Sequence, residues 1–258
     1  MRGLEGKVAV VPGGATKIGA AIVAAFRKAG TRVMIADIAT EAGAALVADG
    51  VAFQPTDLRD DDQIAALVAA TTGRFGRIDF LVNVACSYLD NGAASTRAEW
   101  LESLDVNIVG SVMLMQAARA ELARNRGAIV NFGSISARVA QTGRWLYPVS
   151  KAAILQLTRN QAMDLAPEGI RVNAVSPGWT WSNIMDELTG GDRAKTDRVA
   201  APFHLLKRTG DPDEVAAAVL FLCSDEAGFI TGTDIRVDGG YTAMGPERAE
   251  PAIPLLME

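Results

Sequence analysis

Short apolar runs of strand length alternate along this chain with segments of helical periodicity. The alternation predicts parallel strands joined by helical crossovers, which is an α/β fold with a doubly wound sheet of about seven strands flanked by helices. Ligands of such a sheet bind at the carboxyl ends of its strands. The expected strands are residues 7–11, 32–36, 52–56, 79–83, 127–132, 171–176 and 234–237. The expected helices are residues 18–29, 41–48, 60–72, 98–124, 147–166 and 212–223.

The chain has 258 residues, 49% hydrophobic and 21% charged, which is enough for one well-buried domain. We expect a single domain over residues 1–258, with a substrate lid at 177–212 and a C-terminal tail at 241–258. A net charge of -5 without a basic run argues against nucleic acid or a membrane surface as partner. With no signal peptide and two cysteines, Cys86 and Cys223, we expect a cytoplasmic protein with free thiols.

A glycine-containing turn follows the first expected strand. It reads Pro12-Gly13-Gly14-Ala15-Thr16-Lys17-Ile18-Gly19 and leads into helical periodicity. Unpaired amides at the start of that helix can hold a pyrophosphate, and glycines let the backbone approach it closely. Asp37 ends the next strand, where a carboxylate can bind both hydroxyls of an adenosine ribose and repel a 2′-phosphate. Together these features indicate a dinucleotide site.

Tyr147 and Lys151 lie one helical turn apart, thirteen residues or more beyond Ser134. At this spacing the two side chains share one helix face, with Cβ atoms about 5–6 Å apart. A neighbouring ammonium favours the phenolate and lowers the pKa of a tyrosine from its ordinary value of about 10. Pro148 is tolerated chiefly in a first turn, which places Tyr147 near the positive end of the helix dipole. The pair therefore predicts a proton-transferring tyrosine.

These segments resemble, in their order and spacing, the short-chain dehydrogenase/reductase family over about residues 4–242. The other matching segments are Thr56-Asp57-Leu58, Leu81-Val82-Asn83-Val84-Ala85, Val106-Asn107-Ile108-Val109-Gly110, Pro177-Gly178, Ile230-Thr231-Gly232 and Val237-Asp238-Gly239-Gly240. The resemblance implies a Rossmann-type fold and an NAD(P)-dependent oxidoreductase that acts on CH–OH groups.

The resemblance also implies roles for individual residues. Ser134 positions the substrate oxygen, and Tyr147 is the acid/base. Lys151 lowers the pKa of that tyrosine and binds the nicotinamide ribose, while Asn107 holds a water for proton relay. Asp57 and Leu58 meet the adenine, and Thr180 and Ser182 hold the nicotinamide carboxamide. The full set of implied cofactor-binding residues is Gly13, Lys17, Ile18, Gly19, Asp37, Asp57, Leu58, Asn83, Ala85, Tyr147, Lys151, Pro177, Gly178, Thr180 and Ser182.

Four residues depart from the family pattern. Pro12 stands where threonine is usual, and Lys17 replaces a second glycine of the turn. Lys17 either reaches the pyrophosphate as a point charge or points to solvent. Val84 lacks the amide that normally braces the central strand, and Cys86 is expected to be a small apolar filler.

Aromatic residues gather in the segments expected around the nicotinamide end. With Ser134, the candidate substrate residues are Trp145, Trp179 and Trp181, joined by Met185 and Phe203. Because cationic residues are few in these segments, we expect a neutral, partly apolar substrate. His204, the one histidine, has no second ligand at metal-binding spacing, so we assign it no catalytic or metal role and expect no metal.

The resulting hypothesis is an NAD-dependent dehydrogenase of a secondary alcohol, or a reductase of the matching ketone, with Tyr147 as acid/base. An NADPH-dependent carbonyl or ketoacyl reductase is the alternative, disfavoured by Asp37. A cofactor-free lyase similar to halohydrin dehalogenases is less favoured, because Lys151, Asp37 and Asp57 are intact. Apolar residues on more than one face of the two long expected helices, 98–124 and 147–166, indicate partners in a homotetramer.

Overall fold

The computed structural model describes residues 1–245. Their centre is one parallel sheet with the strand order β3-β2-β1-β4-β5-β6-β7. The strands are β1 (Val8–Pro12), β2 (Arg32–Asp37), β3 (Val51–Pro55), β4 (Phe80–Asn83), β5 (Ala128–Phe132), β6 (Arg171–Pro177) and β7 (Asp234–Val237). The expected seven-stranded doubly wound sheet is therefore confirmed. Chain order reverses at β1, which lies between β2 and β4, so a crevice opens at the carboxyl ends of β1 and β4.

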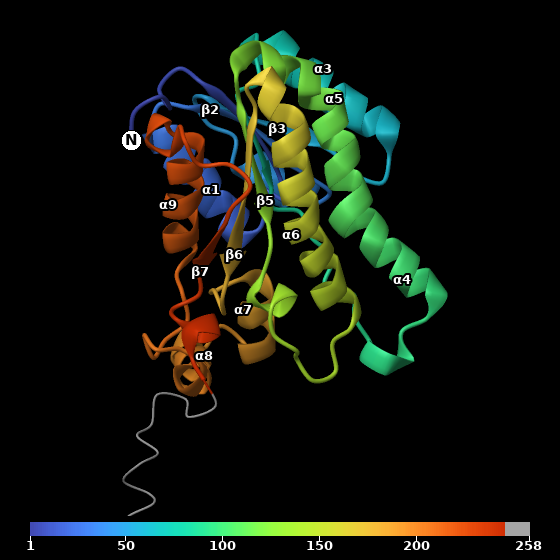
Figure 1. Cartoon of the computed structure of the whole chain (residues 1–258), viewed down its shortest axis with the longest axis vertical. Helices are drawn as coiled ribbons and strands as arrows, with labels where there is room; N and C mark the ends of the chain where they lie inside the picture. Colours follow the sequence, from blue (N-terminus) through green and yellow to red (C-terminus); the bar gives the residue numbers. More distant parts are fainter. Residues whose placement is uncertain (246–258) are drawn as a thin grey trace, which may run out of the picture.

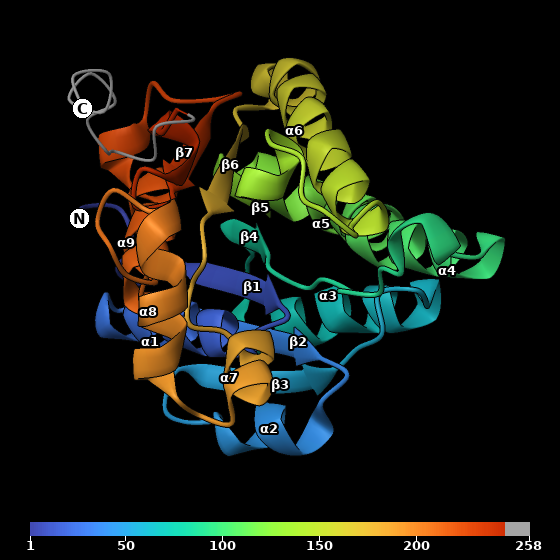
Figure 2. The ribbon, with the colours of Figure 1, turned by 90° about the horizontal axis from the view of Figure 1, so that it is seen from below.

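Helices cover both faces of the sheet (Figures 1 and 2). On one face lie α1 (Lys17–Lys28) and α9 (Pro212–Cys223), and on the other lie α3 (Asp61–Phe75), α5 (Gly110–Asn125) and α6 (Leu146–Leu165). The remaining helices are α2 (Thr40–Ala45), α4 (Arg97–Leu104), α7 (Asn183–Thr189) and α8 (Arg193–Ala200). None of the helices in residues 1–245 is both long and apolar enough to span a membrane.

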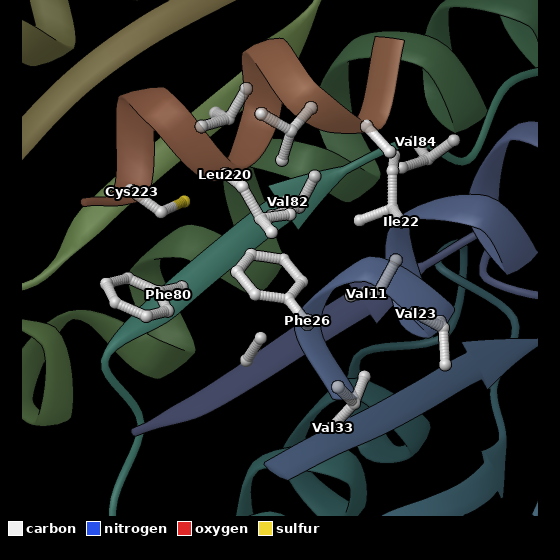
Figure 3. Packing of buried hydrophobic residues seen from close by; sticks show 14 of the residues in the cluster. Val11, Ile22, Val23, Phe26, Val33, Phe80, Val82, Val84, Leu220 and Cys223 are labelled. Atoms are coloured by element: carbon white, nitrogen blue, oxygen red, sulfur yellow. The ribbon is translucent and has the colours of Figure 1, made fainter. Parts of the chain in front are cut away.

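The apolar core forms one cluster on each face of the sheet. Between the sheet and helices α1 and α9, the fully buried ring of Phe26 stacks on Phe80 at 5.8 Å between ring centroids (Figure 3). Val11, Val33 and Leu220 complete this cluster from β1, β2 and α9. Strands buried on both faces have continuous apolar runs, which is why their positions were readable from sequence.

Two expected elements differ in the structure. The single helix expected at 98–124 is interrupted by a π-helical turn, Asp105–Val109, between α4 and α5. The irregular stretch expected at 177–212 contains α7 and α8, separated by Gly190 and Gly191, which both have positive φ. Short helices bounded by caps and glycines carry too few turns to show a periodicity. The expected tail at 241–258 lies mostly outside the described residues; a 3-10 turn occupies Tyr241–Ala243.

The starts of β1 and β4 are joined by a fully buried carboxylate, Asp79. One of its oxygens accepts a hydrogen bond from the Val8 amide at 3.0 Å, and Arg77 donates to both oxygens at 2.6 and 2.7 Å. Lys7 adds an ion pair at 3.2 Å. The carboxylate thereby ties the residue before β4 to the first residue of β1. Without it the Val8 amide and the Arg77 guanidinium would lose their acceptor.

We expect Asp79→Ala to lower the free energy of unfolding by about 3 kcal/mol or more, because it leaves a buried amide and a guanidinium without their acceptor. Urea unfolding at pH 7 followed by circular dichroism measures this. Asp49→Ala is the control, since Asp49 is exposed and makes no side-chain hydrogen bond among the described residues. A change of less than about 1 kcal/mol in the Asp79 variant would contradict this role for the carboxylate.

Candidate active site

The glycine turn after β1 is held in a single conformation. Gly13 has a φ of +77°, and a Cβ there would lie 2.5 Å from the backbone nitrogen of Ala85. A Cβ at Gly19 would lie 2.1 Å from the carbonyl oxygen of Gly13. Thr16 caps α1 by accepting a hydrogen bond from the Gly19 amide at 3.1 Å and donates to the Gly13 carbonyl at 2.8 Å. Both glycines are thus required, and the helix start faces the crevice.

Lys17, which stands where the family usually has a glycine, is the first residue of α1. Its φ is not positive, so the backbone accommodates the side chain without strain. Its ammonium forms an ion pair with Asp186 of α7 at 2.9 Å. The Lys17 amide donates to the Asn183 side chain at 2.8 Å. The side chain therefore neither points freely to solvent nor extends into the turn; it ties α7 to the start of α1.

The end of the crevice predicted to hold the adenosine half of a cofactor is a cavity of about 330 Å³ lined in part by Gly13, Asp37, Asp57, Leu58 and Ala85. Asp37 accepts hydrogen bonds at 3.0 Å from the Ala15 and Ala39 amides, which fixes its carboxylate. Arg59 binds Asp57 at 2.7 Å, and this contact lowers the pKa of the Asp57 carboxyl below its ordinary value. The sequence-predicted residues of this end are thus brought together, with Arg59 added.

Ser134, Tyr147 and Lys151 meet in a neighbouring cavity of about 150 Å³. Ser134 follows β5, and the other two project from the first turns of α6. Tyr147 is 8% and Lys151 4% exposed. The Lys151 ammonium donates to the carbonyl of Phe132 at 2.9 Å and lies 5.5 Å from the centre of the Tyr147 ring. The sequence-predicted catalytic trio is therefore assembled.

The pKa of Tyr147 is raised above its ordinary value, because burial disfavours the phenolate. Hydrogen bonding with Ser134 and the charge of Arg144 act in the opposite direction. The largest contributions to this shift come from groups other than Lys151, and the lowering of the Tyr147 pKa by Lys151 stays a prediction.

Asp90 holds the beginning of α6 in place, although the sequence analysis did not single it out. Its carboxylate accepts hydrogen bonds from the amides of Trp145 at 2.9 Å, Tyr147 at 3.0 Å and Gly92 at 3.0 Å. Burial alone would raise the pKa of Asp90, but these backbone hydrogen bonds outweigh it and lower that pKa. An acid 57 residues before Tyr147 therefore caps α6.

Asn107 lies in the π-helical turn and is buried. Its side chain accepts from the Ser87 amide at 2.6 Å and donates to the Ser87 carbonyl at 3.0 Å and to Ser150 at 3.1 Å. These bonds clamp the loop after β4 to α6. A π-helical turn commonly marks a functional position, and here it aims the amide at that loop.

The residues at the end of β4 fall into different surroundings. The Asn83 side chain donates to Asn131 at 2.8 Å and lines neither cavity. Val84 packs in the apolar cluster beside α1, while the Pro12 carbonyl accepts from the Val84 and Ala85 amides at 3.2 and 2.9 Å. The central strands are therefore braced by backbone bonds. Cys86 lines both cavities, and burial raises the pKa of its thiol.

The tryptophans divide between the cavity and its surroundings. Trp179 lines the catalytic cavity and contacts the Phe203 ring at 5.5 Å between ring centroids. Trp145 does not line this cavity. Its side chain is 53% exposed, whereas the next residue, Leu146, is fully buried at the start of α6. Trp181 is also outside, beside Lys17 and Arg193. Two of the three predicted substrate tryptophans thus lie elsewhere.

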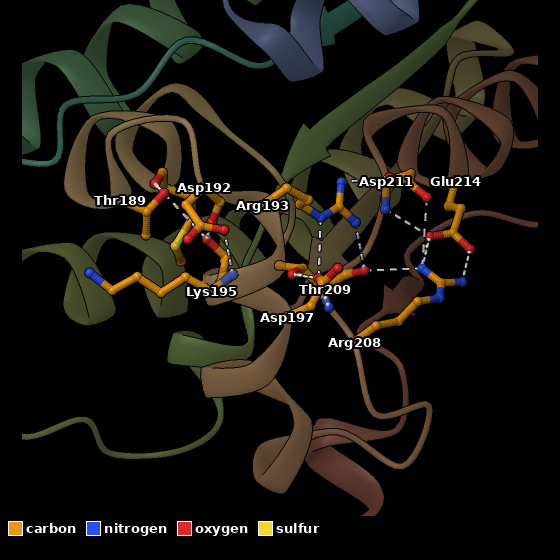
Figure 4. A network of polar contacts seen from close by, with 11 residues as sticks. Thr189, Asp192, Arg193, Lys195, Asp197, Arg208, Thr209, Asp211 and Glu214 are labelled. Atoms are coloured by element: carbon orange, nitrogen blue, oxygen red, sulfur yellow. Dashed lines mark hydrogen bonds and ion pairs between the residues drawn. The ribbon is translucent and has the colours of Figure 1, made fainter.

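A polar network joins α7, α8 and the start of α9 (Figure 4). Arg193 binds Asp197 at 3.1 Å and Asp211 at 2.8 Å, and Asp197 also accepts from Thr209. Arg208 holds the pKa of Glu214 down at about 2.

His204 is buried near this network, with Nδ1 2.9 Å from the Ala200 carbonyl oxygen. Within residues 1–245 no group of three or more metal-ligating side chains occurs.

Four polar side chains of the catalytic cavity were missed by the sequence analysis. They are Tyr88, Ser136, Gln141 and Arg144. The Tyr88 and Tyr147 rings stack with centroids 5.1 Å apart. The only sequence signal for Arg144 is its place three residues before Tyr147, on a segment that has to cross the site.

The two cavities adjoin, since Thr16 and Cys86 line both, and together they form what is here called the groove, with Asp37 at one end and Tyr147 at the other. A dinucleotide requires a carboxylate for the adenosine ribose, a glycine-lined helix start for the pyrophosphate and a reactive group beyond it. The groove provides these in that order. Ile18, Pro177, Gly178, Thr180 and Ser182, predicted for the cofactor, all line its catalytic end.

Comparison with known proteins agrees with this geometry. A family model described as enoyl-(acyl carrier protein) reductase matches residues 13–242. The chain is 37% identical to L-fucose dehydrogenase of Oryctolagus cuniculus (94% of this chain, 87% of that protein) and 36% identical to cis-4-hydroxycyclohexanecarboxylate dehydrogenase of Sinomonas cyclohexanicum (92% and 97%). The ligand-free structure of aldohexose dehydrogenase from Thermoplasma acidophilum superimposes with a TM-score of 0.86 at 32% identity, covering 94% of this chain and 96% of that one. The chain belongs to the short-chain dehydrogenase/reductase family and is an oxidoreductase acting on CH–OH groups.

Proposed function

We propose that the chain is an NAD-dependent dehydrogenase of a secondary alcohol, or a reductase of the matching ketone, with Tyr147 as acid/base. The single observation that carries the proposal is the buried Tyr147 between Ser134 and Lys151, at the end of a groove that begins at Asp37. The names of the fucose and hydroxycyclohexanecarboxylate relatives support an alcohol substrate.

In the proposed reaction Tyr147 moves the proton of the substrate hydroxyl, and Ser134 orients the substrate oxygen by a hydrogen bond. The nicotinamide of a bound dinucleotide supplies the hydride acceptor or donor. Lys151, held by the Phe132 carbonyl, binds the nicotinamide ribose and stabilises the phenolate once it forms. Thr180 and Ser182 hold the carboxamide, and Asn107 supports the proton relay. The protein's contribution is positioning and control of the Tyr147 pKa.

The cofactor assignment rests on the charges of the adenosine cavity. Asp37 points a fixed carboxylate at it, and the one arginine in its lining, Arg59, is bound to Asp57. Lys17 is paired with Asp186 rather than turned to this cavity. A 2′-phosphate would therefore meet a negative charge without a free cation to offset it, which supports NAD over NADP. An NADPH-dependent carbonyl or ketoacyl reductase remains the alternative.

Residues 177–212, with α7 and α8, are proposed to act as a lid over the groove. Their contact with the start of α1 through Lys17 supports this role.

We also propose a homotetramer. Large apolar side chains stand exposed on the outer side of α4, the π-helical turn and α6, namely Leu101, Val109, Val149 and Met163. Apolar helix surface of this kind is suited to a subunit interface.

Tyr147→Phe is expected to reduce turnover of secondary alcohols at least about 1,000-fold, because only the proton-transferring hydroxyl is lost. NAD affinity should stay within about twofold of wild type. Steady-state absorbance of reduced cofactor and titration calorimetry measure the two quantities. Tyr241→Phe, outside the groove, is the control. Residual activity above about a tenth of wild type would refute the acid/base role.

Asp37→Ala is expected to reduce the preference for NAD over NADP by about 10-fold or more, because it removes both the ribose acceptor and the repulsion of a 2′-phosphate. The measurement is the ratio of kcat/KM for the two cofactors. Asp49→Ala should leave this ratio unchanged. A wild-type enzyme that already prefers NADP would show that the assignment of Asp37 is wrong.

Light scattering at micromolar concentration should give a mass of about four times the 27.1 kDa of one chain. Val149→Glu together with Met163→Glu, which places charge on the exposed side of α6, should reduce that mass. A wild-type mass near 27.1 kDa would exclude the tetramer.

A further inference from the structure

Arg144 lies directly over the catalytic tyrosine. Its guanidinium carbon is 4.6 Å from the centre of the Tyr147 ring, and its side chain is 35% exposed in the lining of the catalytic cavity. A guanidinium stacks favourably on an aromatic face. The contact therefore places the guanidinium beside the Tyr147 ring, within the cavity lining.

Within residues 1–245 the guanidinium forms an ion pair with Asp90 but donates no hydrogen bond. The nearest carboxylate, Asp90, is 3.9 Å from Arg144 Nε, which is too far for a hydrogen bond. Asp90 also accepts from the amides of Gly92, Trp145 and Tyr147. Among the described side chains, Arg144 donates no hydrogen bond from its guanidinium, whereas Arg138 on the same segment binds Asp234 at 2.8 Å.

The charged side chains that line the cavity are all cationic. Its lining includes two cationic side chains, Arg144 and Lys151, and no aspartate or glutamate. Lys151 donates one hydrogen bond to the Phe132 carbonyl and is assigned above to the nicotinamide ribose and the Tyr147 phenolate, which leaves Arg144 as the cation for a substrate group. Ser136, also in the lining, donates to Gln141 at 2.7 Å, and Ile135, Ile184 and Met185 are among the apolar residues of the lining.

We propose that Arg144 binds a carboxylate of the substrate, so that the enzyme oxidises a hydroxy acid or reduces the matching oxo acid. This inference rests on the proposed dehydrogenase function and replaces the expectation of a neutral substrate. The planar fork of a guanidinium matches a carboxylate through two parallel hydrogen bonds. With the carboxylate on Arg144, a hydroxyl a few bonds away can reach Ser134 and Tyr147, since all three side chains line the same cavity.

The test compares matched substrates that differ only in charge. 3-Hydroxybutyrate, 3-hydroxycyclohexanecarboxylate and mandelate are each assayed with NAD beside the corresponding primary carboxamide. The wild type should prefer the acids in kcat/KM by about 10- to 100-fold, mainly through KM. Arg144→Gln should lose that preference on the acids it turns over, and Arg144→Lys should restore only part of it, because an ammonium keeps the charge but not the fork.

Arg144 also affects the pKa of Tyr147, but that effect is common to both members of a substrate pair and cancels in the ratio. Arg97→Gln is the matched control, since Arg97 is exposed on α4 and does not line the cavity. It should keep the wild-type preference for acids. If the acids and amides are turned over equally and Arg144→Gln changes neither, the inference is overturned while the proposed dehydrogenase function stands.

A binding measurement separates failure of the inference from failure of the function. Calorimetric titration with cyclohexanecarboxylate and cyclohexanecarboxamide, neither of which carries a reacting hydroxyl, is done on the full chain with NAD present and absent. The acid should bind wild type about 10-fold or more tightly than Arg144→Gln, and the amide equally to both. If no alcohol is oxidised but this difference is seen, the carboxylate site stands and the proposed function fails; equal binding of the acid to both proteins refutes the site.

Discussion

The geometry of the catalytic cavity depends on the hydrogen bonds that Asp90 accepts from the first amides of α6. The residue at the N-cap of α6 is Trp145, whose side chain makes no capping hydrogen bond. The buried carboxylate of Asp90 takes that place from the loop after β4 and satisfies amides that would otherwise be unpaired. The same bonds fix Tyr147 relative to the end of β4 and place Arg144 over its ring. Asn107 strengthens the joint by holding Ser87, in the same loop, against α6.

At the other side of the crevice the glycine turn contacts the proposed lid directly. Lys17 stands at the first position of α1, where a side chain can be accommodated because the backbone is helical, and it reaches α7. The amide of Lys17 has no acceptor within the helix and belongs to the donors at a helix start that can bind anions. In this structure it donates to the Asn183 side chain. A pyrophosphate at this turn would therefore contact a site to which the lid is directly bonded. Lys17, which departs from the family pattern, thus joins the proposed cofactor site to the proposed lid.

The strands and most helices could be predicted from sequence because burial on both faces imposes continuous apolar runs, and burial on one face imposes a helical period. The exceptions have local causes. The π-helical turn at Asp105–Val109 leaves the apolar pattern of its flanking helices intact, so the pattern does not reveal it. Helix α7 has seven residues, ends at Gly190 and forms an ion pair from Asp186 to Lys17 of α1. Helix α8 has eight residues, is capped by Asp192 and forms ion pairs from Arg193 to Asp197 and Asp211. Their stability comes from contacts with residues outside the segment.

The sequence by itself determined which reactive groups the site contains. A tyrosine and lysine one turn apart, a serine after a strand and glycines at a strand end carry their chemistry in residue type and spacing, and parallel strands bring their carboxyl ends to one edge. Only the tertiary structure decided how those groups are charged and what surrounds them. Trp145 points outward and Arg144 inward, although the two are adjacent in sequence. The pKa of Tyr147 is raised by burial, and the cap on its helix comes from Asp90. Burial and hydrogen bonding depend on contacts between residues far apart in the chain, which no local spacing specifies.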